Sequence, residues 1–224
     1  MTSGVFCDLI HRDSRTGSLW ISPGFIANTN INSGSLKTSG LDISMNYNYN
    51  LAKYGGLGFA FNGTYVDKYE NQPISGGGSY DCVGYYGATC GGGAGGVGLV
   101  PKWRHKFRTV WSAPYWGGFD LAVTWRHIDS VKLDALSSNP FMAGSGNPIA
   151  GDELGARDYM DLAFTWTFWK KWTLRAGVNN VFDRDPPLCD SGTACGAPFG
   201  NGNTYPGTYD SMGRKFFTGL TVNF

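Results

Sequence analysis

Residues 41–51 read LDISMNYNYNL, with an apolar or aromatic side chain at every second position. One face of an extended chain would carry Leu41, Ile43, Met45, Tyr47, Tyr49 and Leu51. The opposite face would carry Asp42, Ser44, Asn46, Asn48 and Asn50. A period of two residues is typical of a β-strand with two unlike faces. The stretch therefore predicts a strand that separates an apolar surface from a polar one.

Six further segments repeat this alternation. They are LGFAFNGTY (57–65), LVPKWRHKFRTVW (99–111), FDLAVTWRH (119–127), MDLAFTWTF (160–168), WTLRAGVNNVF (172–182) and the closing segment that ends at Phe224. Together with residues 41–51 they make about seven strands. Most of them approach the 9–11 residues with which a tilted strand crosses a bilayer.

The connections between these strands alternate in length. Short ones at 52–56, 114–117 and 170–171 alternate with long ones at roughly 70–97, 131–157 and 184–208. Compact soluble domains rarely contain several long loops, whereas outer-membrane barrels have short periplasmic turns and long extracellular loops. Aromatic residues gather at the short turns, as in the girdle at a membrane interface: Tyr54, Tyr115, Trp116, Trp169 and Trp172. We predict an all-β fold, an antiparallel transmembrane β-barrel.

The composition agrees with this fold class. The 224 residues include 34 Gly and are 15% aromatic but only 16% charged, below the roughly 25% usual for soluble domains. The formal charge of +1 favours neither a nucleic-acid partner nor an acidic tail. No apolar run reaches the length of a transmembrane helix.

The direction of the strands follows if the long connections are extracellular. The strand at 36–51 then descends towards the periplasm, and each later strand reverses. Residues 1–35 become an extracellular loop, with a hairpin around NTNINSG (28–34), and residues 36–224 carry the barrel strands. Bacterial single-chain barrels have an even number of strands, so we expect at least one more before Met1. The opening residues lack the pattern of a secretory signal, which we also expect upstream.

Five cysteines point to an oxidising compartment. Cys82 and Cys90 flank one Gly-rich segment, and Cys189 and Cys195 flank another, as small loop disulfides would. Neither pair has the spacing of a zinc site. Cys7 is left over, and we expect its partner in an upstream portion. Unpaired cytosolic thiols are the alternative interpretation.

Enzymatic motifs are not found. The Gly-rich runs at 75–79 and 90–98 lack the Lys-Ser/Thr pair that completes a phosphate loop, and loops are the better interpretation. Asp152, Glu153 and Asp158 cluster in one connection without a neighbouring histidine in the sequence, so a hydrolase site is not indicated. We predict no enzyme activity, cofactor or metal site.

A row of cations occupies the polar face of one strand and its neighbours. The members are Lys102, Arg104, Lys106, Arg108, Arg126 and Arg175. If the aromatic face meets lipid, these cations point into the lumen, where charge is tolerated. They could attract an anionic substrate such as a ferric chelate or an acidic sugar. Alternatively, they pair with acidic residues of a plug or of facing strands.

The C-terminal region resembles that of TonB-dependent outer-membrane receptors. LRAGVNNVFDRDPP (174–187) carries an N-N-x-F-D-x-x-P-like motif with Asn179, Asn180, Phe182, Asp183 and Pro186. The last strand carries a Y-D-x-x-G-R-x-F motif with Tyr209, Asp210, Gly213, Arg214 and Phe216. LKTSGLDISMNYNY (36–49) and FCDLIHRDSRTGSL (6–19) are similar to a mid-barrel segment and an extracellular loop of this family. In NNVFDRD, a strand end and turn is the favoured interpretation, and a cation site at Asp183 and Asp185 is the alternative.

The resemblance implies a 22-stranded barrel in the outer membrane of a Gram-negative bacterium, in contact with its lipid. An N-terminal plug and a short box that engages the TonB complex would lie upstream of Met1, and the substrate would be a ferric siderophore, vitamin B12 or an oligosaccharide. The resemblance also implies that Gly219, Val222 and Phe224 form the signal read by the barrel assembly machinery.

Alone, the seven strands are expected to form an open curved sheet whose two edges lack partners. Two alternatives to a receptor stay open at this point. The chain could be a small self-contained outer-membrane barrel with a structural or adhesion role, or a soluble secreted β-sandwich that binds carbohydrate.

Overall fold

The computed structural model describes residues 7–28, 34–74, 76–92, 98–115, 117–142, 152–189 and 204–223. The chain divides into two compact units, Met1–Gly34 and Ser35–Phe224. Among the described residues, no helix is long and apolar enough to cross a membrane.

The first unit contains a short hairpin. A 3-10 helix, η1 (Cys7–Leu9), leads into β1 (Ile10–His11), which pairs antiparallel with β2 (Phe25–Ile26). The rings of His11 and Phe25 stack across this pair with centroids 4.3 Å apart. Asp13 closes the turn after β1, since its Oδ1 accepts hydrogen bonds from the backbone N–H and the hydroxyl of Thr16. The hairpin expected around residues 28–34 lies largely outside the described residues.

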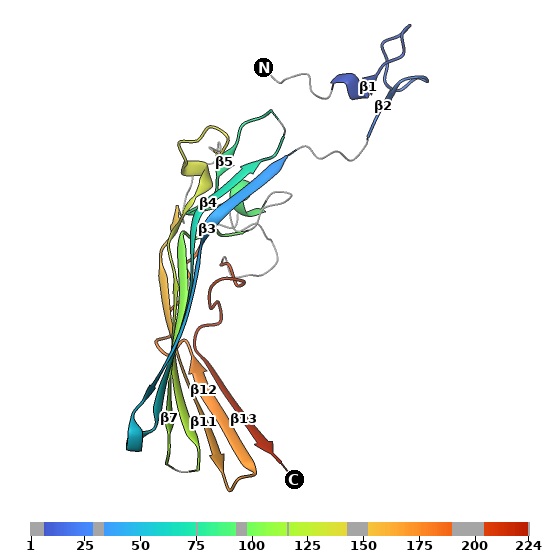
Figure 1. Ribbon diagram of the computed structural model, residues 1–224. Coiled ribbons are helices and arrows are strands. Elements are labelled where there is room, and N and C mark those ends of the chain that lie inside the picture. The colour runs from blue at the N-terminus through green and yellow to red at the C-terminus, as the bar shows by residue number, and fades with distance from the viewer. Residues whose placement is uncertain are drawn as a thin grey trace. The chain divides into compact units, whose positions relative to one another are not determined.

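The second unit is dominated by one antiparallel sheet. Its seven main strands are β3 (Ser35–Asn50), β4 (Gly56–Gln72), β7 (Trp103–Ala113), β8 (Phe119–Ile128), β11 (Arg157–Phe168), β12 (Trp172–Asn179) and β13 (Lys215–Val222). Each pairs with its predecessor in this series, so the spatial order follows the chain. Figure 1 shows the strands side by side in one twisted sheet, with neither β3 nor β13 paired on its outer edge by a described strand. The prediction of an open sheet of about seven antiparallel strands is confirmed.

Two strand bounds differ from the sequence prediction for physical reasons. β4 continues to Gln72, well past Tyr65, because a bulge opposite Ser39 and Gly40 lets polar residues go on pairing with β3. β12 ends at Asn179 because Asn180 adopts a positive φ of 54°, which turns the chain away from the sheet.

The short turns all lie at one end of the sheet (Figure 1). The 3-10 helix η2 (Ala52–Tyr54) joins β3 to β4, and tight turns join β7 to β8 and β11 to β12. Gly55 has a φ of 95°, and a side chain there would clash with the backbone oxygen of Ser112. Only glycine therefore fits this turn.

Within the described residues, the long connections contain packed structure. They contain β5 (Tyr80–Asp81), which pairs with β4, and a small sheet of β6 (Tyr85–Tyr86), β9 (Val131–Leu133) and β10 (Glu153–Leu154). They also contain the π-helix η3 (Ala88–Gly92) and the 3-10 helix η4 (Asp134–Leu136). A buried cluster joins these segments to the sheet: Tyr86, Val131, Leu133, Leu154, Tyr159, Cys189 and Tyr209.

A disulfide joins Cys82 and Cys90 in the connection between β4 and β7, as the sequence predicts. Cys189 is buried and disulfide-bonded, whereas Cys195 lies outside the described residues. Cys7 is exposed and forms no disulfide with a described residue.

Candidate functional site

Strand register sorts the side chains of the sheet into two faces. Met45, Phe61, Phe107, Trp125 and Met160 lie opposite one another across five neighbouring strands. One position away on β4, β7, β8 and β11, the same register aligns Asn62, Lys106, Arg126 and Tyr159. The apolar and polar rows of the sequence thus become continuous surfaces, here called the apolar face and the polar face.

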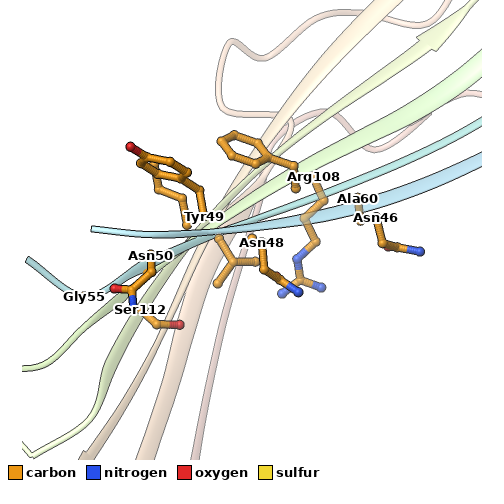
Figure 2. Close-up of a pocket in the computed structure, with 13 residues that line it drawn as sticks. Asn46, Asn48, Tyr49, Asn50, Gly55, Ala60, Arg108 and Ser112 are labelled. Atoms are coloured by element: carbon orange, nitrogen blue, oxygen red, sulfur yellow. The ribbon is translucent and has the colours of Figure 1, made fainter. Parts of the chain in front are cut away.

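The polar face is hollowed in two places. A hollow of about 800 Å³ near the short turns is lined by residues that include Asn46, Asn48, Arg108 and Ser112. Figure 2 shows Asn46, Asn48 and Arg108 on one side of the ribbons, whereas Tyr49 lies on the other. A second hollow of about 490 Å³ lies nearer the long connections and includes Arg104, Lys106 and Thr208 in its lining. The candidate functional site is this polar, hollowed face.

Four of the predicted cations are exposed on the polar face, three of them on β7. Arg104, Lys106 and Arg108 alternate along β7, where they lie opposite Thr64, Asn62 and Ala60 of β4. None of the three forms an ion pair with a described residue. Arg175 lies on the same face of β12, opposite Thr165 and Gly219. Charges in a row without acidic partners attract anions.

Arg126 differs from these cations because two carboxylates bind it. Its Nε donates to Asp161 Oδ2 over 2.8 Å, and its Nη1 donates to Asp210 Oδ1 over 3.0 Å. Its guanidinium also lies 4.9 Å from the centre of the Tyr159 ring. For this residue the structure supports the ion-pair interpretation, and its charge is compensated within the chain.

Lys102 does not belong to the row of exposed cations on the polar face either. It precedes β7, and its ammonium lies 5.7 Å from the centre of the Tyr65 ring. Tyr65 pairs with Leu41 and Trp103, so it belongs to the apolar face. The alternation that placed Lys102 with the polar face fails because this residue lies outside the regular strand.

The two family-like motifs, at residues 179–186 and 209–216, contact each other near the long connections. Asn180 is fully buried, and its side chain bonds both the N–H and the C=O of Arg184. Asp183 Oδ1 accepts a hydrogen bond from the Arg214 N–H over 2.7 Å. Gly213 has a φ of 67°, and a side chain there would meet the same carboxylate at 2.8 Å. These contacts support the turn interpretation, with Asp183 bound to the second motif.

The remaining motif residues occupy varied environments. Asn179 ends β12 opposite Lys215, Phe182 and Phe216 are exposed, and Tyr209 is buried. Burial raises the pKa of Tyr209 to about 12. In the proposed assembly signal, Gly219 lies opposite Arg175 and Val222 opposite Trp172. Phe224 lies outside the described residues.

Sequence reasoning missed one carboxylate, Asp161, and the partner of another, Asp158. Asp161 bridges Arg126 and the N–H of Asn180. Asp158 has a histidine partner after all, since its Oδ1 lies 2.8 Å from His127 Nδ1. Arg126 and His127 both lie on β8, which neighbours the strand of the two carboxylates. Such contacts can be recognised only once the strand register is known. Among the described residues, no group of three or more His, Cys, Asp or Glu side chains could hold a metal ion.

Long antiparallel strands with one apolar and one polar, cationic face, joined by short turns at one end, define the wall of an outer-membrane β-barrel. A sequence profile of the family described as TonB dependent receptor-like, beta-barrel matches residues 8–181, well over half of the chain. The chain belongs to this family, whose members are located in the outer membrane of Gram-negative bacteria.

Solved structures show the same fold. A mutant of the ferric enterobactin receptor from Pseudomonas aeruginosa matches with a TM-score of 0.51 and 20% identity, over 84% of this chain and 22% of that one. The ferric yersiniabactin uptake receptor from Yersinia pestis matches with a TM-score of 0.50 and 13% identity, over 86% of this chain and 24% of that one. The chain thus spans about a quarter of these receptors. No curated protein matches it in sequence.

Proposed function

We propose that this chain is part of a receptor that binds a scarce anionic nutrient and imports it, without catalysis, across the outer membrane. The cations of the polar face carry this proposal. Arg104, Lys106 and Arg108 are exposed, lack ion pairs among the described residues and border two hollows. An inner wall with this charge raises the local concentration of an anion and speeds its entry.

A ferric chelate is the substrate class that we favour. The two similar solved structures are receptors for ferric siderophores by name. Many such chelates carry net negative charge, which the three free cations would attract. An acidic oligosaccharide fits the same charges, whereas a neutral sugar or vitamin B12 would make no use of them. Import would further require a plug domain and coupling to the TonB complex, which we expect from the family.

The proposal is tested on the complete receptor barrel that contains this chain. We expect the double variant Arg104→Ala, Arg108→Ala to bind an anionic ferric siderophore roughly tenfold more weakly at low salt, a difference of about 1.4 kcal/mol. The salt dependence of binding should become shallower, because fewer charges contribute. Lys102→Ala is the matched control, since it removes a cation from the opposite face.

The two interpretations of the cations predict different outcomes. If the row binds substrate, affinity falls and the stability of the barrel is unchanged. If the row instead holds acidic residues of a plug, affinity and its salt dependence stay the same, and the plug becomes easier to release with urea. The second result would contradict the proposed substrate role.

A further inference from the structure

The apolar face carries one carboxylate on its inner strands. Asp158 of β11 lies opposite His127 of β8 in the strand register, and its Oδ1 lies 2.8 Å from His127 Nδ1. The same oxygen accepts a hydrogen bond of 2.7 Å from Trp125 Nε1. Asp158 precedes Met160 of the apolar face by two positions, so both side chains belong to this face. A polar pair, here called the Asp158–His127 pair, thus lies among aromatic and aliphatic side chains.

The Asp158–His127 pair lies within the apolar band of the barrel wall. On the same face, Trp111 donates Nε1 to the backbone oxygen of Tyr54 and so marks the short-turn end. His105, which pairs with His127, precedes Trp111 by six positions on β7. At about 3.3 Å per residue and a tilt near 40°, this separation corresponds to about 15 Å across the membrane. Because the apolar band of such barrels is about 25 Å tall, the pair lies at a depth of acyl chains, not of headgroups.

The pair is incomplete within the part of the chain that the structure describes. The side chain of Asp158 is 51% exposed, and its Oδ2 accepts no hydrogen bond from a described residue. Nδ1 of His127 donates to the carboxylate, whereas its Nε2 bonds to no described residue. Ionisable groups at this depth are unfavourable unless they pair with other protein groups. Further barrel strands would attach beyond β3 or β13, away from β8 and β11, so the missing partner belongs to another protein chain.

The chemistry of the pair fits a second copy of the same surface. One residue accepts and the other donates, and they lie on neighbouring strands about 4.8 Å apart. With the strand tilt, their heights differ by only about 3 Å. A two-fold axis along the membrane normal, placed between them, brings Asp158 of each copy opposite His127 of the other. Each His127 then donates from both ring nitrogens to carboxylates, and the charges of the two copies balance.

The surface beside the pair is apolar and partly rigid. Half-exposed side chains continue from the pair towards the short turns on β8 and β11: Val123, Trp125, Leu162 and Trp166. Asp158 holds the indole N–H of Trp125, and the His105 ring lies perpendicular to the indole with centroids 4.4 Å apart. Trp125 is therefore fixed while 39% of it stays exposed. A fixed aromatic ring loses little entropy on binding, which favours association through this surface.

We propose that the Asp158–His127 pair and the apolar side chains beside it form the interface through which two copies of the receptor associate in the membrane. Asp158 of each copy accepts a hydrogen bond from Nε2 of the other copy's His127. The Trp125 rings pack beside the two-fold axis and keep lipid away from the carboxylates. This interface lies on the opposite face from the proposed nutrient site and rests only on the assignment of the apolar face to lipid.

The first test is cross-linking of the complete receptor in native membranes. The background variant is Cys7→Ser, which removes the exposed free thiol. Met160→Cys places a thiol beside the pair, and Phe61→Cys is the matched control, because Phe61 lies in the same row of the apolar face on β4. A short, membrane-permeable bifunctional thiol reagent should join Met160→Cys copies into a product of twice the receptor mass. It should leave Phe61→Cys copies as single chains.

The second test addresses the reciprocal ion pairs. In the Met160→Cys background, Asp158→Asn and His127→Asn should each reduce the dimeric product roughly tenfold, because each breaks both ion pairs. Co-expression of these two variants with different tags should restore a mixed dimer. In that dimer one ion pair survives, between Asp158 of one variant and His127 of the other. Two misfolded variants could not recover in this way.

Three results would overturn the proposal. The first is equal cross-linking at Met160→Cys and Phe61→Cys, or a product that contains a different protein. The second is undiminished cross-linking in Asp158→Asn and His127→Asn. The third is loss of the product in both variants without a mixed dimer on co-expression. Binding of an anionic ferric siderophore should be the same in all these variants, so the interface and the proposed nutrient site fail independently.

Discussion

Arg126 on β8 binds Asp210, which lies 84 residues further along the chain in the connection before β13. Two hydrogen bonds of 3.0 and 2.5 Å join the guanidinium to the carboxylate, and Asp161 on β11 binds the other side of the same group. Asp210 N–H also donates to the hydroxyl of Tyr159 over 3.4 Å. This arrangement fixes the last long connection to the polar face, where Thr208 lines the hollow beside Arg104 and Lys106.

We expect Arg126→Met to release this connection. The substitution keeps much of the side-chain volume but leaves two partly buried carboxylates without their cation, which should cost roughly 2–3 kcal/mol of local stability. Amide exchange around Tyr209 should become much faster, while exchange in the middle of β8 changes little. Arg126→Lys should cause a smaller loss of local stability than Arg126→Met, because a lysine ammonium keeps the charge but cannot form bidentate hydrogen bonds with both carboxylates. Unchanged exchange at Tyr209 in Arg126→Met would contradict this role.

We predict that Asn180 stabilises the turn after β12 in two ways, through its positive φ and through its side-chain hydrogen bonds. Asn180→Ala loses two hydrogen bonds to Arg184 and forces alanine into a positive φ, so we expect a loss of about 2 kcal/mol in local stability. Asn180→Gly loses the same bonds but relieves the backbone, and its loss should be smaller. Urea titration of the refolded receptor measures the order of the two variants. Equal stability of both would show that the conformation contributes nothing.

The Cys82–Cys90 disulfide is expected to act locally. It closes a short loop in the long connection between β4 and β7, and its removal should cost that connection roughly 2–3 kcal/mol. The paired variant Cys82→Ser, Cys90→Ser should therefore be cut by protease between residues 76 and 100 while the strands stay protected. Loss of the folded barrel in this variant would show that the connection also supports the sheet.

Two tyrosines in the connection before β13, the buried Tyr209 and the half-buried Tyr205, should ionise at higher pH than free tyrosine. Burial raises the pKa of Tyr205 and of Tyr209 to about 12. In the unfolded chain they ionise near pH 10, so their packing is fully stabilising below that pH and is lost as the pH rises towards 12. Tyrosinate absorbance should show a late component that Tyr205→Phe with Tyr209→Phe removes. A titration complete by pH 10.5 in the original protein would contradict this packing.

The strands and their two faces could be predicted because one face of each strand meets an apolar medium and the other does not. Residues 41–51 or 160–168 must alternate strictly, and the register of the sheet preserves that alternation. Beyond Tyr65 the pattern disappears in VDKYENQ, although β4 continues through it. There the sequence pattern no longer marks the strand, which pairs with β3 and packs Val66 and Tyr69 against a buried cluster of the long connections.

The candidate site could be predicted only in part, because charge compensation depends on long-range pairs. The alternation placed Arg104, Lys106 and Arg108 on one face, as the register shows. It could not show that Arg126 is neutralised by Asp161 and Asp210, since Asp210 lies 84 residues further along the chain. Nor could it show that His127 meets Asp158 across neighbouring strands. Such contacts depend on the register, which the spacing of residues alone does not determine.

The central claim is that the row of cations faces the lumen while the aromatic row faces lipid. Cysteine labelling of the complete receptor in native membranes tests it directly, with Lys106→Cys and Phe107→Cys as adjacent positions on β7. We predict that a charged, water-soluble thiol reagent modifies Lys106→Cys, and that a lipid-phase reagent modifies Phe107→Cys. The reverse pattern, or equal labelling of both positions by the water-soluble reagent, would contradict the assignment of the two faces.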